Sequence, residues 1–303
     1  ILFIISSILI IGCASESMEF TTAKTALRSE KNFSRAEEWF IKALQTDSLN
    51  ALVPYIYATE ILKQQNRYIE MINMLNEANN RNSNQKLETP FIWEDKPMLT
   101  IGDGVQAYKE QEWTKIYNLA IDNYQNKKID KAIENFIIAI QLLPEEGNTY
   151  ATLGAIYLEK NMFQDANNIL EEGLKLSPNN IAIIEVLASN YIQMSSLYEK
   201  GDQKNIYLLK AEKILIKGLE LNRSANPGNL LRQLIFVVID LEKYDQAIEY
   251  SMQAIRNFPN DPDIYYNVAV LYQKMGINIF DIARNLYLQI SQEENRDSDV
   301  LNK

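Results

Sequence analysis

The sequence contains no histidine, one cysteine, and few glycine and proline residues among its 303 positions. Without histidine, the chain cannot form a Ser-His-Asp or Cys-His nucleophile pair, a His-ligated zinc or iron site, or a histidine general base. One cysteine excludes cysteine-rich zinc sites, iron–sulfur clusters and disulfides within this sequence. Carboxylate dyads and Ser–Lys pairs remain, so the composition disfavours an enzyme without excluding one. We predict no catalytic residues, no metal site and no cofactor.

The scarcity of turn-forming residues points to a helical fold. Ten glycines and eight prolines make up about 6% of the chain, against about 12% in average proteins. Sandwiches and barrels with many strands need such residues at every turn. Hydrophobic residues account for 47% of the chain, which is enough to build buried cores. The composition therefore predicts an all-α protein.

The formal charge of the chain is −10, from 30 basic and 40 acidic residues. An acidic protein repels phosphate backbones unless it carries a local basic stripe. The basic residues are isolated or interleaved with acids, as at Lys127-Lys128 and around Arg28, Lys31 and Arg35. We therefore predict no nucleic-acid partner.

The N-terminus begins with eleven uncharged, mostly apolar residues, Ile1 to Ile11. A membrane span needs roughly 20 residues, whereas the apolar region of a signal peptide needs about 7–15. The sequence starts at isoleucine rather than methionine and has no basic residues before the run. We therefore expect residues 1–12 to be a signal peptide whose first residues are missing.

Ile10, Ile11, Gly12 and Cys13 follow one another at the end of this run. This tetrad resembles the lipobox of bacterial lipoproteins. The resemblance implies cleavage before Cys13, a diacylglyceryl group on its thiol and acylation of the new amino terminus. Several acyl chains together give the stable anchoring that one chain does not. The alternative is a truncated transmembrane helix that ends near a cysteine.

The lipobox resemblance also predicts where the protein is found. It implies a cell-envelope protein that contacts the membrane through its lipid, with residues 13–17 as a short tether. Alanine rather than aspartate at position 14 resembles outer-membrane sorting in enterobacteria. We therefore expect an outer-membrane anchor facing the periplasm.

The rest of the chain repeats with a fixed period. In the clearest unit, Asn148 to Pro178, the repeat positions hold Tyr150, Leu153, Gly154, Tyr157, Ala166, Leu170, Gly173 and Pro178. This spacing resembles the tetratricopeptide repeat, a helix-turn-helix unit of 34 residues. Small residues at 154 and 166 allow two helices to cross closely, and Pro178 ends the second helix.

Shifting the pattern along the chain finds seven units. The positions that carry them include Phe20, Ala36 and Phe40; Tyr55, Leu62 and Leu75; Ile116, Ala132 and Phe136; Ile184, Leu187 and Tyr191; Leu231, Ala247 and Pro259; and Tyr265, Val268 and Tyr272. In the fifth unit the second helix arrives eleven residues late, at Ala211, which indicates an insertion near 195–207. In the seventh, Ala283 arrives two places late. The resemblance implies a right-handed superhelical solenoid of antiparallel helix pairs.

These units divide the chain into segments. We predict repeats at 18–78 and 113–297, an irregular insertion at 79–112, and a polar tail or cut edge at 298–303. In the insertion we expect Phe91, Ile92 and Trp93 to fill a gap in the solenoid. The Gly-Asp-Gly triplet at 102–104 fits no calcium loop, so we interpret it as a turn that caps a helix beginning at about Gly104.

The concave face of such a solenoid binds peptides or protein segments. The resemblance assigns this face to positions 2, 5, 9, 12 and 13 of each unit. The candidate groove residues are Tyr117, Tyr124, Gln125, Asn148, Glu159, Glu185, Ile192, Gln193, Asn229, Arg232, Phe236, Asp240, Tyr266, Gln273 and Lys274. Rings, amides and mixed charges suit an extended peptide. The clamp by which chaperone adaptors of this family hold a C-terminal carboxylate is absent, because Tyr117, Ile121, Ala151 and Ala155 occupy its positions.

The sequence therefore predicts a non-catalytic, membrane-anchored scaffold that binds protein or peptide segments within a cell-envelope assembly. We expect no small-molecule substrate. Two alternatives stay open at this point. One is an enzyme with its active site in the 79–112 insertion or in a missing domain, and the other is a structural spacer without a specific ligand.

Overall fold

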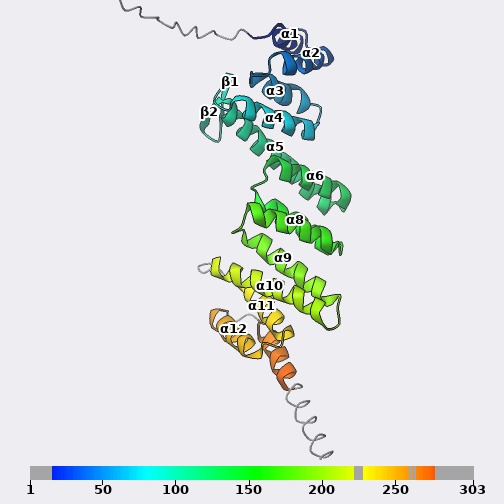
Figure 1. Ribbon diagram of the computed structural model, residues 1–303, viewed down its shortest axis with the longest axis vertical. Coiled ribbons are helices and arrows are strands. Elements are labelled where there is room, and N and C mark those ends of the chain that lie inside the picture. Colours follow the sequence, from blue (N-terminus) through cyan, green and yellow to red (C-terminus); the bar gives the residue numbers. More distant parts are fainter. Residues whose placement is uncertain (1–15, 222–227, 259–261, 263, 277–303) are drawn as a thin grey trace, which may run out of the picture. The chain divides into compact units, whose positions relative to one another are not determined.

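The computed structural model describes residues 16–221, 228–258, 262 and 264–276 (Figure 1). Cys13, the apolar run, the 298–303 tail and Ala283 lie outside the described residues. The chain divides into an N-terminal unit, Ile1–Leu143, and a C-terminal unit, Pro144–Lys303.

From residue 16 onward, where the structure describes it, the N-terminal unit consists of three helix pairs and one β-hairpin (Figure 1). The pairs are α1 (Met18–Arg28) with α2 (Phe33–Thr46), α3 (Leu52–Tyr57) and the π-helix η1 (Ala58–Leu62) with α4 (Tyr68–Asn82), and α5 (Ile101–Gln125) with α6 (Ile129–Leu142). The hairpin joins β1 (Lys86–Trp93) to β2 (Lys96–Thr100).

Aromatic rings from successive pairs form the core of the N-terminal unit. Phe20 meets Phe40 edge-on with 6.1 Å between ring centroids, and Phe40 stacks on Tyr57 at 5.7 Å. Ala23 and Ala36 are fully buried beside them. The apolar residues of the first repeat thus fill the space between helices, as their periodicity predicts.

The stretch 79–112, which we predicted to be irregular, is regular over most of its length. It contains the end of α4, the antiparallel hairpin and the first turns of α5. The helix begins at Ile101, before the predicted position. A capping box starts it, because the Asp103 amide donates to Thr100 Oγ1 at 3.3 Å and the Thr100 amide donates to Asp103 Oδ2 at 2.9 Å. A Cβ at Gly104 would lie 2.5 Å from Tyr55 Oη, so this glycine makes room for a ring.

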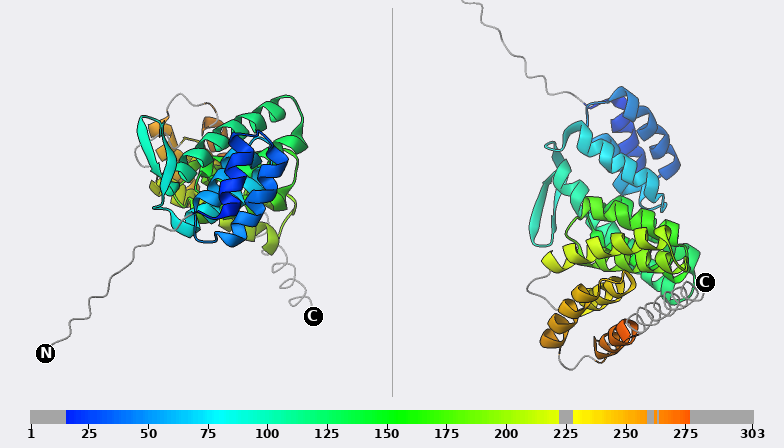
Figure 2. Two further views of the ribbon diagram at one scale, coloured as in Figure 1. Left: turned by 90° about the horizontal axis from the view of Figure 1, so that it is seen from above. Right: turned by 60° about the horizontal axis from the view of Figure 1, so that its bottom comes forward.

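The C-terminal unit contains three helix pairs and one further helical segment (Figure 2). The pairs are α7 (Gly147–Glu159) with α8 (Phe163–Leu176), α9 (Ile181–Ser196) with α10 (Asp202–Leu221), and α11 (Gly228–Asp240) with α12 (Tyr244–Asn257). Residues 264–276 are helical and correspond to the first helix of the seventh predicted repeat. The all-α class and the paired helices are confirmed in both units, with the hairpin as the departure.

The turn between α9 and α10 contains the residues that we predicted as an insertion near 195–207. The helix α9 continues to Ser196, and α10 begins at Asp202. Gly201 lies between them with φ of +109°, a conformation that glycine adopts more readily than other residues. The extra residues are therefore divided between a longer turn and added turns at the start of α10.

Two glycines of the fourth repeat lie where its helices cross most closely. A Cβ at Gly154 would come within 2.5 Å of Leu170 Cγ, and one at Gly173 within 2.5 Å of Tyr150 Cγ. Ordinary carbon–carbon contacts lie at about 3.5–4.0 Å. The crossing of α7 and α8 therefore requires glycine at both positions.

Five of the turns between paired helices share one backbone geometry, and the turn between α9 and α10 is different. Lys31, Asn66, Lys127, Asn161 and Glu242 have φ between 52° and 60° and lie two residues before the second helix of their pair. After α5, for example, the Lys128 amide donates to Asn123 O at 2.8 Å, as in a Schellman motif. These five turns are made without glycine, which helps to explain its scarcity.

Candidate functional site: a hollow between α9 and α11

A hollow of about 310 Å³ lies between α9 and α11 in the C-terminal unit. Its lining residues are Ser189, Ile192, Gln193, Arg232, Gln233 and Phe236. On α9 they occupy positions i, i+3 and i+4, which share one helix face. The predicted candidates Ile192, Gln193, Arg232 and Phe236 therefore come together at this site.

The lining combines an exposed ring with amides and a guanidinium. Phe236 is 42% exposed, which is high for a large apolar side chain. Gln233 Nε2 lies 3.2 Å from Ser189 Oγ and donates to it. Gln233 Oε1 is buried and has no hydrogen-bond partner in the described part of the chain. Because its oxygen is enclosed by protein atoms, Gln233 serves the packing of α11 against α9, and the exposed amide of Gln193 is the one that a ligand can reach.

Asp240 and Lys274 were predicted to be groove residues, but they pair with each other. Asp240 also contacts Lys204 Nζ, with 3.0 Å between Oδ2 and the nitrogen. Burial alone would raise the pKa of the Asp240 carboxyl, but hydrogen bonds from Lys274 and Lys204 outweigh it and lower the pKa. The cluster joins α11 to α10 and to the helical segment 264–276, so these charged side chains stabilise the packing of the helices.

Three further candidates lie in the N-terminal unit, on α5. Tyr117 stacks on Trp113 with 5.1 Å between centroids and meets Phe136 edge-on at 5.5 Å, so it is part of the packing between α5 and α6. Tyr124 is half-buried, and Gln125 is exposed at the end of the helix.

The remaining candidates lie in the C-terminal unit outside the hollow. Asn148 accepts a hydrogen bond from Asn180 Nδ2 at 3.2 Å, which joins the starts of α7 and α9. Glu159 and Asn229 are exposed, and Glu185 is half-buried on α9. Gln273 is exposed on the helical segment 264–276. The structure brings none of these residues into the lining of the hollow.

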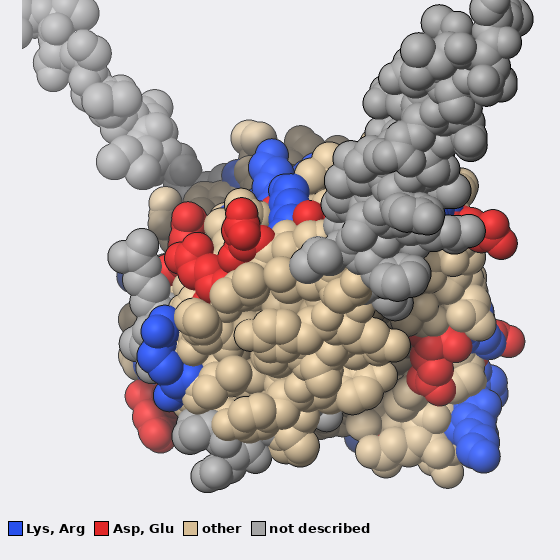
Figure 3. Space-filling view, turned by 90° about the horizontal axis from the view of Figure 1, so that it is seen from below, with Lys and Arg blue, Asp and Glu red and all other residues tan. Residues whose placement is uncertain are grey.

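Tyr266 is 70% exposed on the helical segment 264–276. Figure 3 shows a broad area without charged side chains on the lower side of the molecule, with acidic and basic side chains along its edges. Its exposure alone makes Tyr266 a candidate contact residue, separate from the hollow.

Our sequence prediction missed Ser189 and Gln233. Ser189 occupies the ninth position of its repeat, which the family pattern already assigns to the groove, so the signal was present. Gln233 occupies the sixth position, which the pattern does not assign. Only the packing of α11 against α9 brings it to the hollow.

The N-terminal unit has a cavity of about 310 Å³ beside the hairpin, where Tyr55, Phe91 and Tyr108 form an aromatic wall. Glu88 of β1 pairs with Lys24 at 2.6 Å and with Arg28 at 3.0 Å, which holds the hairpin to α1. Burial would raise the pKa of Glu88, but the hydrogen bonds from these two cations lower it. A carboxylate that two cations hold ionised is a poor general acid or base, so Glu88 stabilises the position of the hairpin.

Within the described ranges, no three Asp, Glu or Cys side chains are grouped so that they could bind a metal ion. Among the helices of those ranges, none is both long and apolar enough to cross a bilayer.

Comparison with known proteins identifies one repeat directly. Residues 147–180 match the family model of the tetratricopeptide repeat. They comprise α7, α8 and the turn after them, which is the unit that we judged clearest from the sequence. The prediction of tetratricopeptide repeats is thus confirmed for this unit, and the other helix pairs have the same arrangement.

Among curated proteins, the Hsp70-Hsp90 organizing protein of Triticum aestivum is 21% identical over 178 residues, which cover 51% of this chain. The aligned region spans about a third of that relative, 31% of its length.

Solved structures with a similar helical arrangement include a thermophilic tetratricopeptide-repeat protein of Thermus thermophilus, at 21% identity and a TM-score of 0.44, covering 54% of this chain and 83% of that one. PilF of Pseudomonas aeruginosa is 16% identical with a TM-score of 0.40 over 83% and 95% of the two chains. Yeast Tom70 is 17% identical with a TM-score of 0.46, and the match covers 80% of this chain and 43% of Tom70.

Proposed function

We propose that this protein is a non-catalytic scaffold that binds an extended protein or peptide segment in the hollow between α9 and α11. The observation that carries the proposal is the lining itself. An exposed ring, Phe236, lies beside the exposed amide of Gln193 and the half-buried guanidinium of Arg232. Rings provide apolar contact area, and amides bond to a peptide backbone.

The repeat architecture supports the same function. Tetratricopeptide repeats serve in general as surfaces for protein–protein interaction, and residues 147–180 match their family model. The Asp240 cluster holds the elements beside the hollow in place. A rigid groove loses less conformational entropy when a flexible segment binds.

We further propose that Cys13 is lipidated and holds the protein at a bacterial cell envelope, on the outer membrane facing the periplasm. The support is the sequence Ile10 to Cys13 after an apolar run of signal-peptide length. With so short a tether, the first repeat would lie close to the bilayer. In a bacterial host, the wild-type chain should incorporate labelled palmitate and begin at Cys13 after cleavage, whereas Cys13→Ser should incorporate none and keep its apolar run. A wild-type chain without the label, or one cleaved at another residue, would contradict the anchor.

A photo-crosslinking experiment tests the groove. A photoreactive phenylalanine analogue replaces Phe236 in the full chain, and the captured partner is identified by mass spectrometry. The matched control carries the analogue at Met252, an exposed apolar position on α12 outside the hollow. We expect a discrete partner to be captured from position 236 and not from position 252. Equal capture from both positions would refute the assignment of the groove.

A further inference from the structure

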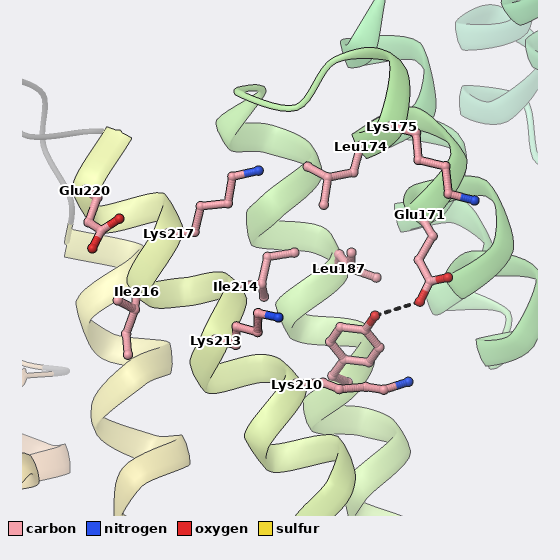
Figure 4. A pocket seen from close by; sticks show the side chains of 11 residues that line it. Glu171, Leu174, Lys175, Leu187, Lys210, Lys213, Ile214, Ile216, Lys217 and Glu220 are labelled. Carbon is pink, nitrogen blue, oxygen red and sulfur yellow. Dashed lines mark hydrogen bonds between the residues drawn. The ribbon is translucent and has the colours of Figure 1, made fainter.

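A second cavity, of about 580 Å³, lies between α8, α9 and α10 (Figure 4). From α9 it takes Leu187 and Tyr191, whereas the hollow described above takes Ser189, Ile192 and Gln193. Successive residues of an α-helix are about 100° apart, so these two sets lie on opposite faces of α9. The second cavity is therefore a separate surface, which we call the lysine pocket.

The lysine pocket has an apolar floor and a mainly basic rim. Figure 4 shows Leu174, Leu187 and Ile214 between the helices, with lysines around them. The charged residues that line it are Lys175, Lys210, Lys213, Lys217, Glu171 and Glu220. Four lysines and two glutamates give the rim a formal charge of +2, in a chain whose net charge is −10.

Some charged groups of the rim already have a partner within the protein, and others do not. Tyr191 Oη donates to Glu171 Oε1 at 2.8 Å, so part of this carboxylate is already bound. Lys217 Nζ donates to Pro178 O at 2.7 Å, and Lys210 Nζ lies 5.4 Å from the centre of the Tyr191 ring. Lys175 and Lys213 have no hydrogen bond or ion pair with another residue of the described chain. Two ammonium groups beside an apolar floor are thus available to a ligand.

We propose that the lysine pocket binds an acidic peptide segment. Carboxylates of the segment pair with Lys175 and Lys213, and an apolar side chain between them lies on Leu174, Leu187 and Ile214. The volume lies within the range of about 300–1,000 Å³ typical of ligand sites. The apolar floor and the rim glutamates fit a peptide better than a nucleic-acid backbone, which offers a continuous row of phosphates.

Because the two sites use opposite faces of α9, one chain can hold two segments at once. This inference does not depend on the proposed function of the hollow. Substitution of Phe236 leaves the lysine pocket intact, and substitution of Lys213 leaves the hollow intact. Failure of one proposal can therefore be distinguished from failure of the other.

Fluorescence anisotropy with the full chain tests the proposal. The probe is a fluorescein-labelled heptapeptide with two leucines flanked by aspartates and glutamates, and the matched peptide has asparagine and glutamine in place of the acids. We expect saturable binding of the acidic probe, at least tenfold weaker binding of its amide counterpart, and weakening of the acidic probe as NaCl rises from 50 to 300 mM. Absence of binding by the acidic probe, or equal binding of both peptides, would overturn the proposal.

Matched variants locate the binding. The double variant Lys175→Glu/Lys213→Glu should bind the acidic probe at least tenfold more weakly than the wild type. Lys213→Gln should weaken binding by a smaller factor. Lys131→Glu, on the exposed face of α6 and outside every cavity described above, should leave it unchanged. Equal loss in the Lys131 variant would indicate an effect of net charge alone. If wild-type chain binds vesicles of anionic phospholipid through Lys175 and Lys213 but does not bind the peptide, the pocket contacts membranes and the peptide assignment is wrong.

Discussion

Replacing Gly154 or Gly173 with alanine tests how the fourth repeat is built. Alanine in a helix interior is normally favoured over glycine by about 0.8–1.0 kcal/mol, so helix propensity alone predicts a more stable protein. The structure predicts the opposite sign. The new Cβ would lie 2.5 Å from Leu170 Cγ or from Tyr150 Cγ, about 1 Å closer than ordinary contact.

Overpacking of this kind costs about 1–3 kcal/mol. Subtracting the propensity gain leaves a net destabilisation of up to about 2 kcal/mol for each variant. The cost at Gly173 should be the larger, because the clashing atoms are Cβ and Cγ of the fully buried Tyr150, which cannot move by rotating a distant bond. Urea denaturation of the full chain, followed by circular dichroism, measures both free energies of unfolding.

A double-mutant cycle with Leu170→Ala identifies the cause. If the clash is responsible, Gly154→Ala should cost at least 1 kcal/mol less in the Leu170→Ala background, because the clashing atoms are gone. Gly276→Ala is the control, since a Cβ there meets nothing within 4 Å. Stabilisation by Gly154→Ala, or equal cost with and without Leu170, would refute the described helix crossing.

Three further predictions follow from other contacts. Glu242→Gly should raise the free energy of unfolding by about 0.5–1 kcal/mol and raise Tm, because Glu242 has φ of 60°, whereas Glu242→Ala should bring no gain. Lys63→Met should destabilise the protein by about 1–3 kcal/mol in urea denaturation, because the side chain of Glu112 is only 2% exposed and loses its nearer cation, Lys63 at 3.0 Å, while Lys115 at 3.5 Å remains; Lys63→Met/Glu112→Leu should recover most of the loss. The lowered pKa of Asp240 means that its contribution to stability is complete above the ordinary value of 3.8 and is lost as pH falls through the lower folded value. Asp240→Asn should therefore make the free energy of unfolding less dependent on pH between 2 and 5, and an unchanged dependence would exclude this role.

Helix pairing was predictable because the repeat places the same residue types at the same spacing. Phe20, Phe40 and Leu170 are buried where the pattern expects them, and Gly154 lies at the close crossing. The hairpin was missed because Lys86–Trp93 lacks strict alternation and is held by long-range ion pairs from Glu88 to α1. The start of α5 was misplaced because its capping signal, Thr100 followed by Asp103, overlaps the Gly-Asp-Gly triplet, which we interpreted as a turn before the helix.

The groove was predictable only in part. The repeat positions predicted which faces of α9 and α11 line the hollow. They therefore identified Gln193, Arg232 and Phe236. They could not show that Asp240 would be bound by two lysines, or that Gln233 would have a buried oxygen without a partner. Both facts depend on side chains distant in sequence. The lysine pocket was missed because its lysines lie on two helices, α8 and α10, and the repeat pattern does not show that they come together.

The most direct test of the central claim is the affinity of the captured partner segment, as a synthetic peptide, for the full chain and its Phe236→Ala variant. Titration calorimetry gives both dissociation constants, with Met252→Ala as the matched apolar truncation outside the hollow. A ring at the centre of a binding site contributes at least about 1–2 kcal/mol, so Phe236→Ala should weaken binding roughly tenfold while Met252→Ala leaves it unchanged. Equal affinities for wild type and Phe236→Ala would contradict the claim that this protein binds its partner between α9 and α11.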